Sequence, residues 1–210
     1  MKNEVFDYNN FYELSSPFAT RPLIMGIQDK LLDSPKAIQI FYGEILPSNP
    51  IEFKAIAGGQ VTDFLWSSLP PLFCVSQKVI DILIQNKFTG WSSFPVITYD
   101  RKGNLLSGYH GFSVKSYAGK IDISRSTIIT KPAVPGYPKT ARFYIGTFFN
   151  ESKWDGSDIF RIQNACMVAR KSIVEEFRRN NITNVRFTPL TETETMDAVY
   201  DTLKDLGKID

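Results

Sequence analysis

The chain carries one pattern twice: SQKVIDILIQNKFTGWSSFPV at Ser76 to Val96 and RKSIVEEFRRNNITNVRFTPL at Arg170 to Leu190. At this offset of 94 residues, identical residues coincide in the pairs Asn86/Asn180, Thr89/Thr183 and Pro95/Pro189. Apolar residues coincide in the pairs Val79/Ile173, Ile80/Val174, Leu83/Phe177 and Phe88/Ile182. The repeat predicts one building block: a short amphipathic helix, a tight turn, and a strand that ends at the proline.

Two of the three expected helices belong to this repeat. The first follows Ser76, which suits an N-cap, and its expected buried residues are Val79, Ile80, Leu83 and Ile84. The second runs from about Lys171 to Arg179, and its expected buried residues are Ile173, Val174 and Phe177. Apolar residues fill the inner face of both helices, so the repeat predicts a scaffold rather than a catalytic site.

A third helix is predicted near the C-terminus. The segment Thr191-Glu192-Thr193-Glu194 fits a capping box, with Thr191 as the N-cap and Glu194 in the first turn. The apolar residues of its expected buried face are Met196, Val199, Tyr200 and Leu203. Gly207 suits the end of this helix.

Alternating apolar and polar residues predict strands over Ala37 to Tyr42, Ile51 to Ala55, Phe94 to Tyr99, Ile121 to Ile129 and Arg142 to Phe149. The polar run 100–104 predicts a hairpin turn, with the return strand beginning at Leu105. The proline-rich segment Lys131 to Lys139, KPAVPGYPK, is expected to be an exposed loop and the one place for a subdivision. Together these elements predict a single α+β domain over residues 1–210, with a mixed or mainly antiparallel sheet and about three helices packed on it.

Composition argues against several classes of protein. The net charge of +2 creates no global attraction to nucleic acid or to an anionic membrane. No apolar run approaches the ~20 residues that cross a bilayer, and the N-terminal MKNEVFDYNNFYEL has no apolar signal core, so we expect a cytoplasmic location. One histidine and two distant cysteines do not supply the four ligands of a usual zinc site, so neither a metal nor a cofactor is expected.

The alternative reading is a small enzyme with one of two catalytic pairs. Cys74 and His110 form a nucleophile–base pair if the fold brings them together, although Cys74 lies in an apolar segment that predicts an inert, buried thiol. Asp155 and Asp158 supply paired carboxylates, although Asp-Gly-Ser-Asp also suits a turn that binds its own backbone. Cys74 and Cys166 lie far apart in apolar surroundings, so buried free thiols in a reducing compartment are expected. A disulfide remains an alternative because both residues occupy comparable places just before the two repeated helices.

Charge is unevenly distributed towards the end of the chain. The basic stretch 170–186 gives a third reading, a nucleic-acid-binding module. The acidic segment 191–210 favours contact with a basic protein partner, through Glu192, Glu194, Asp197 and Asp201. The simpler alternative is that these are two solvated faces that attract each other.

Several motifs, in a fixed order, carry a family resemblance. They are Phe73-Cys74-Val75-Ser76, Phe88-Thr89-Gly90-Trp91, Phe94-Pro95-Val96, Gly108-Tyr109-His110-Gly111-Phe112, Trp154-Asp155-Gly156-Ser157-Asp158-Ile159-Phe160 and Ile182-Thr183-Asn184-Val185-Arg186-Phe187-Thr188-Pro189-Leu190. Over roughly Thr62 to Leu190 the chain resembles the immunity proteins of bacterial polymorphic toxin systems, a group first described as a domain of unknown function.

The resemblance implies a small cytoplasmic protein that binds and neutralises a cognate protein toxin, without catalysis or cofactor. It supplies no catalytic residues, and it implies that the motif residues are scaffold. Inhibition needs a stable, complementary surface, and exposed aromatic residues suit its anchors. We expect Tyr137 on the proline-rich loop and Trp154 beside the Asp-Gly turn to contact the partner.

Overall fold

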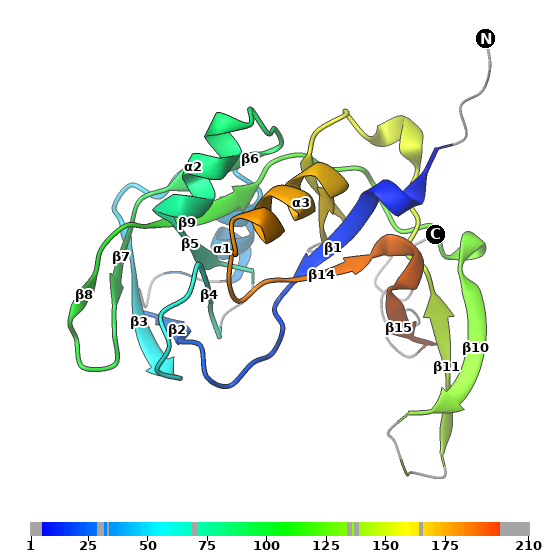
Figure 1. Cartoon of the computed structure of the whole chain (residues 1–210), viewed down its shortest axis with the longest axis horizontal. Helices are drawn as coiled ribbons and strands as arrows, with labels where there is room; N and C mark the ends of the chain where they lie inside the picture. The colour runs from blue at the N-terminus through cyan, green and yellow to red at the C-terminus, as the bar shows by residue number, and fades with distance from the viewer. Residues whose placement is uncertain are drawn as a thin grey trace.

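The computed structural model describes residues 6–28, 32, 34–68, 71–133, 136, 139–163 and 166–197. Within these residues it contains three α-helices and fifteen strands in four mostly antiparallel sheets (Figure 1), the α+β fold that the sequence predicts. The helices are α1 (Ser34–Phe41), α2 (Gln77–Gln85) and α3 (Lys171–Arg179). No helix among these residues is long and apolar enough to cross a membrane.

The first two sheets contain the repeated segments. One has the order β4 (Phe64–Trp66), β5 (Phe73–Ser76), β9 (Tyr109–Val114), β6 (Trp91–Phe94). The other has the order β12 (Ile159–Ile162), β13 (Cys166–Arg170), β1 (Phe11–Ser15), β14 (Arg186–Pro189). In both sheets an antiparallel hairpin is followed by a helix and then by another strand. This last strand does not pair with the hairpin directly, because β9 in one sheet and β1 in the other lies between them.

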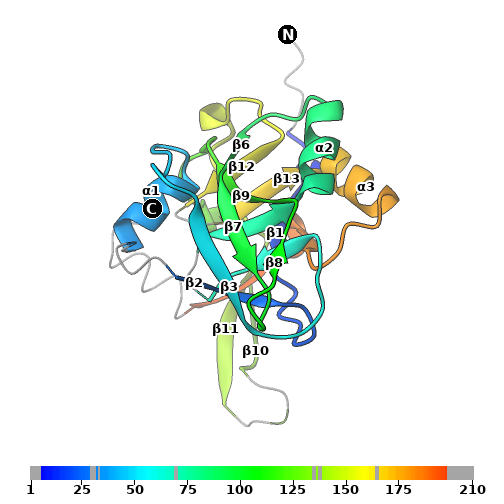
Figure 2. The ribbon, with the colours of Figure 1, turned by 90° about the vertical axis from the view of Figure 1, so that its left-hand side faces the viewer.

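The two remaining sheets flank these. One has the order β2 (Ile24–Ile27), β3 (Ile51–Ala57), β7 (Val96–Tyr99), β8 (Leu105–Leu106), with β3 and β7 parallel. The other has the order β10 (Thr127–Pro132), β11 (Thr140–Ile145), β15 (Glu194–Met196). Figures 1 and 2 both show the β10–β11 hairpin projecting from the rest of the molecule.

Backbone geometry shows that the sequence repeat is also a structural repeat. The two residues before the helices, Ser76 and Arg170, share an extended conformation, with φ of −67° and −68°. Both helices end at asparagine, and each amide nitrogen donates to the carbonyl four residues earlier, at 2.9 Å for Asn86 and 2.8 Å for Asn180. The next residue is left-handed in both copies, with φ of 56° and 52°. The repeated asparagines therefore cap the same turn.

The two repeats hold each other through reciprocal hydrogen bonds. The carboxylate of Asp63, before β4, accepts from the backbone nitrogen and hydroxyl of Thr183, at 2.9 and 2.8 Å. The carboxylate of Asp158, before β12, accepts from the same two groups of Thr89, both at 2.9 Å. Each threonine follows the helix of the opposite repeat, and α2 contacts α3 (Figures 1 and 2). Each repeat therefore binds a threonine of the other repeat through an equivalent aspartate.

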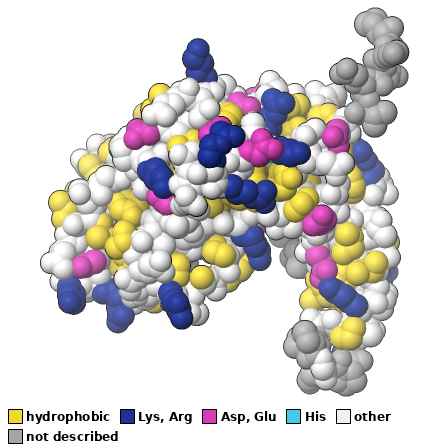
Figure 3. All heavy atoms as spheres, in the orientation of Figure 1, with side chains coloured by type: hydrophobic (Ala, Val, Ile, Leu, Met, Phe, Trp, Pro, Cys, Tyr) yellow, Lys and Arg dark blue, Asp and Glu magenta, His cyan; other side chains and the backbone are white. Residues whose placement is uncertain are grey.

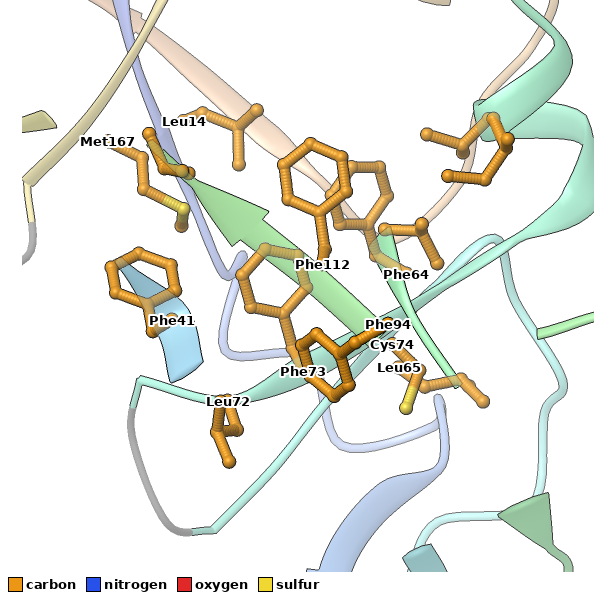
Figure 4. Packing of buried hydrophobic residues seen from close by; sticks show 14 of the residues in the cluster. Leu14, Phe41, Phe64, Leu65, Leu72, Phe73, Cys74, Phe94, Phe112 and Met167 are labelled. Atoms are coloured by element: carbon orange, nitrogen blue, oxygen red, sulfur yellow. The ribbon is translucent and has the colours of Figure 1, made fainter. Parts of the chain in front are cut away.

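Aromatic residues from distant parts of the chain build the main core. Figure 4 shows Phe41 from α1, Phe73 from β5 and Phe112 from β9 converging with Leu14 from β1. The predicted inner face of α3 is buried, and so are Val79, Ile80 and Leu83 of α2. Ile84 is 60% exposed, contrary to the prediction, and Ile82 is buried in its place. Both residues lie at the margins of the apolar face, where periodicity alone does not distinguish them.

Several predicted elements require correction. The segment 37–42 is not a strand, because Ala37, Ile40 and Phe41 form the buried face of α1. The segment 121–129 is interrupted by a 3-10 turn at Ile123–Arg125, and β11 ends before Gly146, whose φ is +89°. The predicted strand 94–99 is divided at Pro95 between β6 and β7, whereas β3 and the β7–β8 hairpin confirm the prediction.

The capping-box prediction is wrong for the residues that the structure describes. Leu190–Glu192 forms a 3-10 turn, and Glu194 belongs to β15, which pairs with β11. The hydroxyl of Thr193 lies 2.7 Å from that of Thr147, so tertiary contacts replace the local cap. The predicted residues 199, 200, 203 and 207 lie outside the described part of the chain. Both cysteines are free, which excludes the disulfide alternative.

Candidate protein-binding interface

The structure does not bring Cys74 and His110 together. In the β5–β9 register, His110 is opposite Val75 and Cys74 is opposite Gly111. Because neighbouring side chains in a strand point to opposite faces, the thiol and the imidazole lie on different sides of the sheet. Cys74 is fully buried and burial raises its pKa, whereas the half-buried His110 has its Nε2 at 2.5 Å from Gln77 Oε1.

The carboxylates of Asp155 and Asp158 bind the scaffold. Asp155 accepts from the backbone nitrogen of Ser157 at 3.0 Å and from the hydroxyl of Ser116 at 2.7 Å. Burial opposes ionisation of Asp155, but these hydrogen bonds outweigh it and hold its pKa below the usual value. Asp158 holds Thr89 and lies 3.6 Å from the guanidinium of Arg170. Over the described ranges, no group of three or more His, Cys, Asp and Glu side chains is placed to bind a metal ion.

Several arginine side chains of the basic stretch 170–186 contact nearby acidic, aromatic or hydroxyl groups. Arg170 pairs with Asp158 and lies over the ring of Trp154, and Arg179 pairs with Glu176. Arg186 donates to the hydroxyl of Ser15 at 3.3 Å. Figure 3 shows acidic and basic side chains interspersed over the surface around α3. The stretch therefore does not form a continuous basic track on this face, and nucleic-acid binding stays an untested alternative.

Trp154 packs against a second cluster of buried hydrophobic residues, which includes Phe11 and Phe160. Its ring lies 5.2 Å from that of Phe11 and 5.7 Å from that of Phe160, and its Nε1 donates to the carbonyl of Ser157 at 3.1 Å. These contacts assign the half-buried indole a structural role. The other predicted aromatic anchor, Tyr137, and the predicted acidic contact Asp201 lie outside the residues that the structure describes.

The remaining acidic contacts predicted from sequence gather around the projecting sheet, where two of them bind that sheet itself. We call β10, β11 and β15 together the arm. Glu194 lies 2.6 Å from Lys131 Nζ, and Asp197 lies 3.5 Å from Arg142 Nε. Glu192 is exposed in the 3-10 turn that precedes β15. Glu194 and Asp197 therefore join β15 to the hairpin, while Glu192 stays on the surface.

Polar contacts join the residues at the base of the arm to one another and to the body. The hydroxyl of Ser126 donates to the carbonyl oxygen of Gly146 at 2.8 Å, and the backbone nitrogen of Gly146 donates to the carbonyl oxygen of Thr193 at 2.9 Å. Arg125 pairs with Glu151 at 2.5 Å and lies over the ring of Tyr8. These contacts orient the hairpin as it leaves the core.

Strand β10 is the exposed edge of the arm, and the sequence analysis predicted only its first half, as the end of the strand expected over Ile121 to Ile129. All of its residues are exposed except the half-buried Lys131, and Ile128 and Ile129 are 51% and 37% exposed. No strand among the described residues pairs with its outer side. The signal was the run Thr-Ile-Ile-Thr followed by Lys131-Pro132, because β-branched residues ending at proline are typical of an edge strand.

A cavity of about 510 Å³ is lined by residues of β1, β4, β13 and α1 and by the segment before β5, with Leu14, Phe41, Leu72 and Met167 in its wall. Its lining includes none of Cys74, His110, Asp155 and Asp158. The cavity is predominantly apolar and does not assemble either predicted catalytic pair.

Glu13 is a half-buried carboxyl that the sequence analysis did not identify. It lies in the central strand β1, and burial raises its pKa, with Arg186 opposing the shift. As pH rises past the ordinary glutamate value, the unfolded chain ionises first, so stability should fall with rising pH through the folded pKa. We expect Glu13→Gln to reduce this fall in urea unfolding between about pH 4 and 7. Glu52→Gln, at an exposed position of β3, is the control, and an equal effect of both variants would contradict the prediction.

Comparison with protein-family models and with curated proteins found no match to this chain.

Proposed function

We propose that this chain is a non-catalytic protein-binding module, an immunity protein that neutralises a cognate bacterial toxin in the cytoplasm. The observation that carries the proposal is the arm, whose exposed strand β10 presents Ile128 and Ile129 away from the core. Exposed apolar residues on a projecting, well-anchored element are typical of a contact surface for another protein. The motif resemblance from Thr62 to Leu190 supports the toxin as the partner.

The positions of the polar residues fit the same proposal. Asp63 and Asp158 clasp the two repeats, and Glu194 and Asp197 hold the arm. Such networks produce a rigid surface, and a rigid surface loses less conformational entropy when it binds.

The test is protection of a susceptible bacterial host. Cells that express the toxin domain encoded by the neighbouring gene should survive when this chain is co-expressed, and the two purified proteins should form a complex. A non-cognate toxin of the same activity is the control, because it should kill with or without the chain. Death of co-expressing cells, together with the absence of a complex, would refute the proposal.

A further inference from the structure

The hydrogen-bonding pattern of the arm identifies which backbone groups of β10 are free. Ala133 N–H donates to the carbonyl of Lys139 at 3.2 Å, which makes this pair a hydrogen-bonded one. Such pairs alternate along an antiparallel ladder, so Lys131/Ala141, Ile129/Phe143 and Thr127/Ile145 are hydrogen-bonded as well. Ile128, Thr130 and Pro132 therefore direct their backbone groups to the outer edge.

Two further observations agree with this assignment. Gly146 N–H donates to the carbonyl of Thr193 on the opposite side of β11. The hairpin register requires this direction, because residues 141, 143 and 145 bond to β10 and the residues between them face the other way. Pro132, which has no N–H, occupies one of the outward positions, where no ladder bond is lost. The outer edge thus offers the N–H and C=O groups of Ile128 and Thr130 and the C=O of Pro132.

These groups define the chemistry of an occupant. Alternating donors and acceptors along an extended edge pair best with another extended chain. Ile128 and Ile129 lie on opposite faces of the sheet, so an added strand would gain an apolar neighbour on each face.

Charge favours an acidic partner over a second copy of this chain. Residues 126–150 contain Lys131, Lys139 and Arg142 and no Asp or Glu. Glu194 and Asp197 pair with two of these cations from the far edge of the arm, and within the described residues Lys139 has no carboxylate partner. A second copy of the hairpin would bring no carboxylate to compensate Lys139, because residues 126–150 contain none, whereas an acidic segment would compensate it.

We propose that an extended, acidic segment of the protein partner adds to the arm as a fourth strand alongside β10. This inference rests on the proposed function and specifies how the toxin would be held. Main-chain hydrogen bonds to Ile128 and Thr130 supply the pairing, and contacts with the two isoleucines fix its position.

Amide hydrogen exchange of the unmodified chain tests the pairing directly. In the free protein, Ile129 and Lys131 should exchange slowly and Ile128 and Thr130 quickly, because only the first two amides point into the ladder. Addition of the purified toxin domain should slow exchange at Ile128 and Thr130. A complex that leaves these two amides fast would overturn the inference while sparing the proposed function, and the absence of any complex would refute both.

Substitution at one outward position gives an independent test. Thr130→Pro removes an outward N–H and blocks the edge, while the intramolecular ladder keeps its bonds. We expect it to weaken toxin binding at least tenfold, with Thr130→Val, which keeps the N–H, within about twofold of the parent. Thermal melts check that both variants fold. Equal affinities of the two variants, or slow exchange at Ile128 and Thr130 that appears only as the chain is concentrated alone, would contradict the proposal.

Discussion

Replacing Gly90 by alanine should destabilise the protein by more than about 3 kcal/mol, because two costs combine at this residue. Gly90 has φ of +90°, a conformation that side chains disfavour. A β-carbon there would also lie 1.8 Å from the carbonyl oxygen of Ile159, which is backbone in the opposite repeat. The strand β12 would have to move, and the clasp between Thr89 and Asp158 would move with it. Chemical denaturation of parent and variant measures the loss.

Gly103 is the matched control for this substitution. Its φ of +89° is almost the same, but nothing lies within 4 Å of the place that a β-carbon would occupy. Gly103→Ala therefore isolates the conformational cost, which we expect to be about 1 kcal/mol. Equal losses at Gly90 and Gly103 would show that the close approach to Ile159 has no energetic importance.

The second repeat has a different residue at the equivalent close approach between the repeats. Asn184 corresponds to Gly90 and has φ of 60°, which asparagine tolerates better than most residues. Its side-chain amide donates to the carbonyl of Phe64 at 2.7 Å, and Phe64 begins β4 as Ile159 begins β12. One repeat thus leaves space for the neighbouring backbone, and the other binds it.

The repeated block was predictable because its information is local. Helical spacing, the capping asparagines and the turn all lie within some twenty residues, and the predicted span of α3 matches the observed helix. The insertion of β1 and β9 into the two sheets was not predictable, because strand partners far apart in sequence leave no local pattern. The false strand at 37–42 arose from a short apolar segment that fits either period, and packing selected the helix.

The interface was less predictable than the fold. Acidic residues near the end of the chain suggested a partner surface, but Glu194 and Asp197 proved to hold the arm. Predicting that outcome requires the β11–β15 pairing, which the capping-box pattern concealed. The end of the edge strand, Lys131 and Pro132, was assigned to a loop because of the nearby prolines, although proline at an outward edge position is compatible with a strand.

Removal of the two clasping carboxylates should cause large and nearly equal losses of stability. Asp63→Ala leaves the Thr183 N–H and the Ser76 hydroxyl without their acceptor, and Asp158→Ala does the same to Thr89. Hydrogen bonds to charged groups contribute about 1.5–3 kcal/mol, so we expect about 2 kcal/mol from each variant. The double variant should lose about 4 kcal/mol, a large share of the stability of a typical domain.

Asp122→Ala is the control, because that carboxylate also accepts from a backbone nitrogen and a hydroxyl, but both belong to Ser124, two residues away. A bond of this kind orders one turn and joins no distant segments, so its loss should cost less than about 1 kcal/mol. Urea unfolding of the four variants distinguishes the two situations. If the two carboxylates contribute equally, Asp63→Ala and Asp158→Ala will lower the free energy of unfolding by similar amounts, and each by more than Asp122→Ala. A silent substitution at either aspartate would mean that its carboxylate makes no net contribution to holding the two repeats together, which would leave that role to the apolar contacts and the remaining hydrogen bonds.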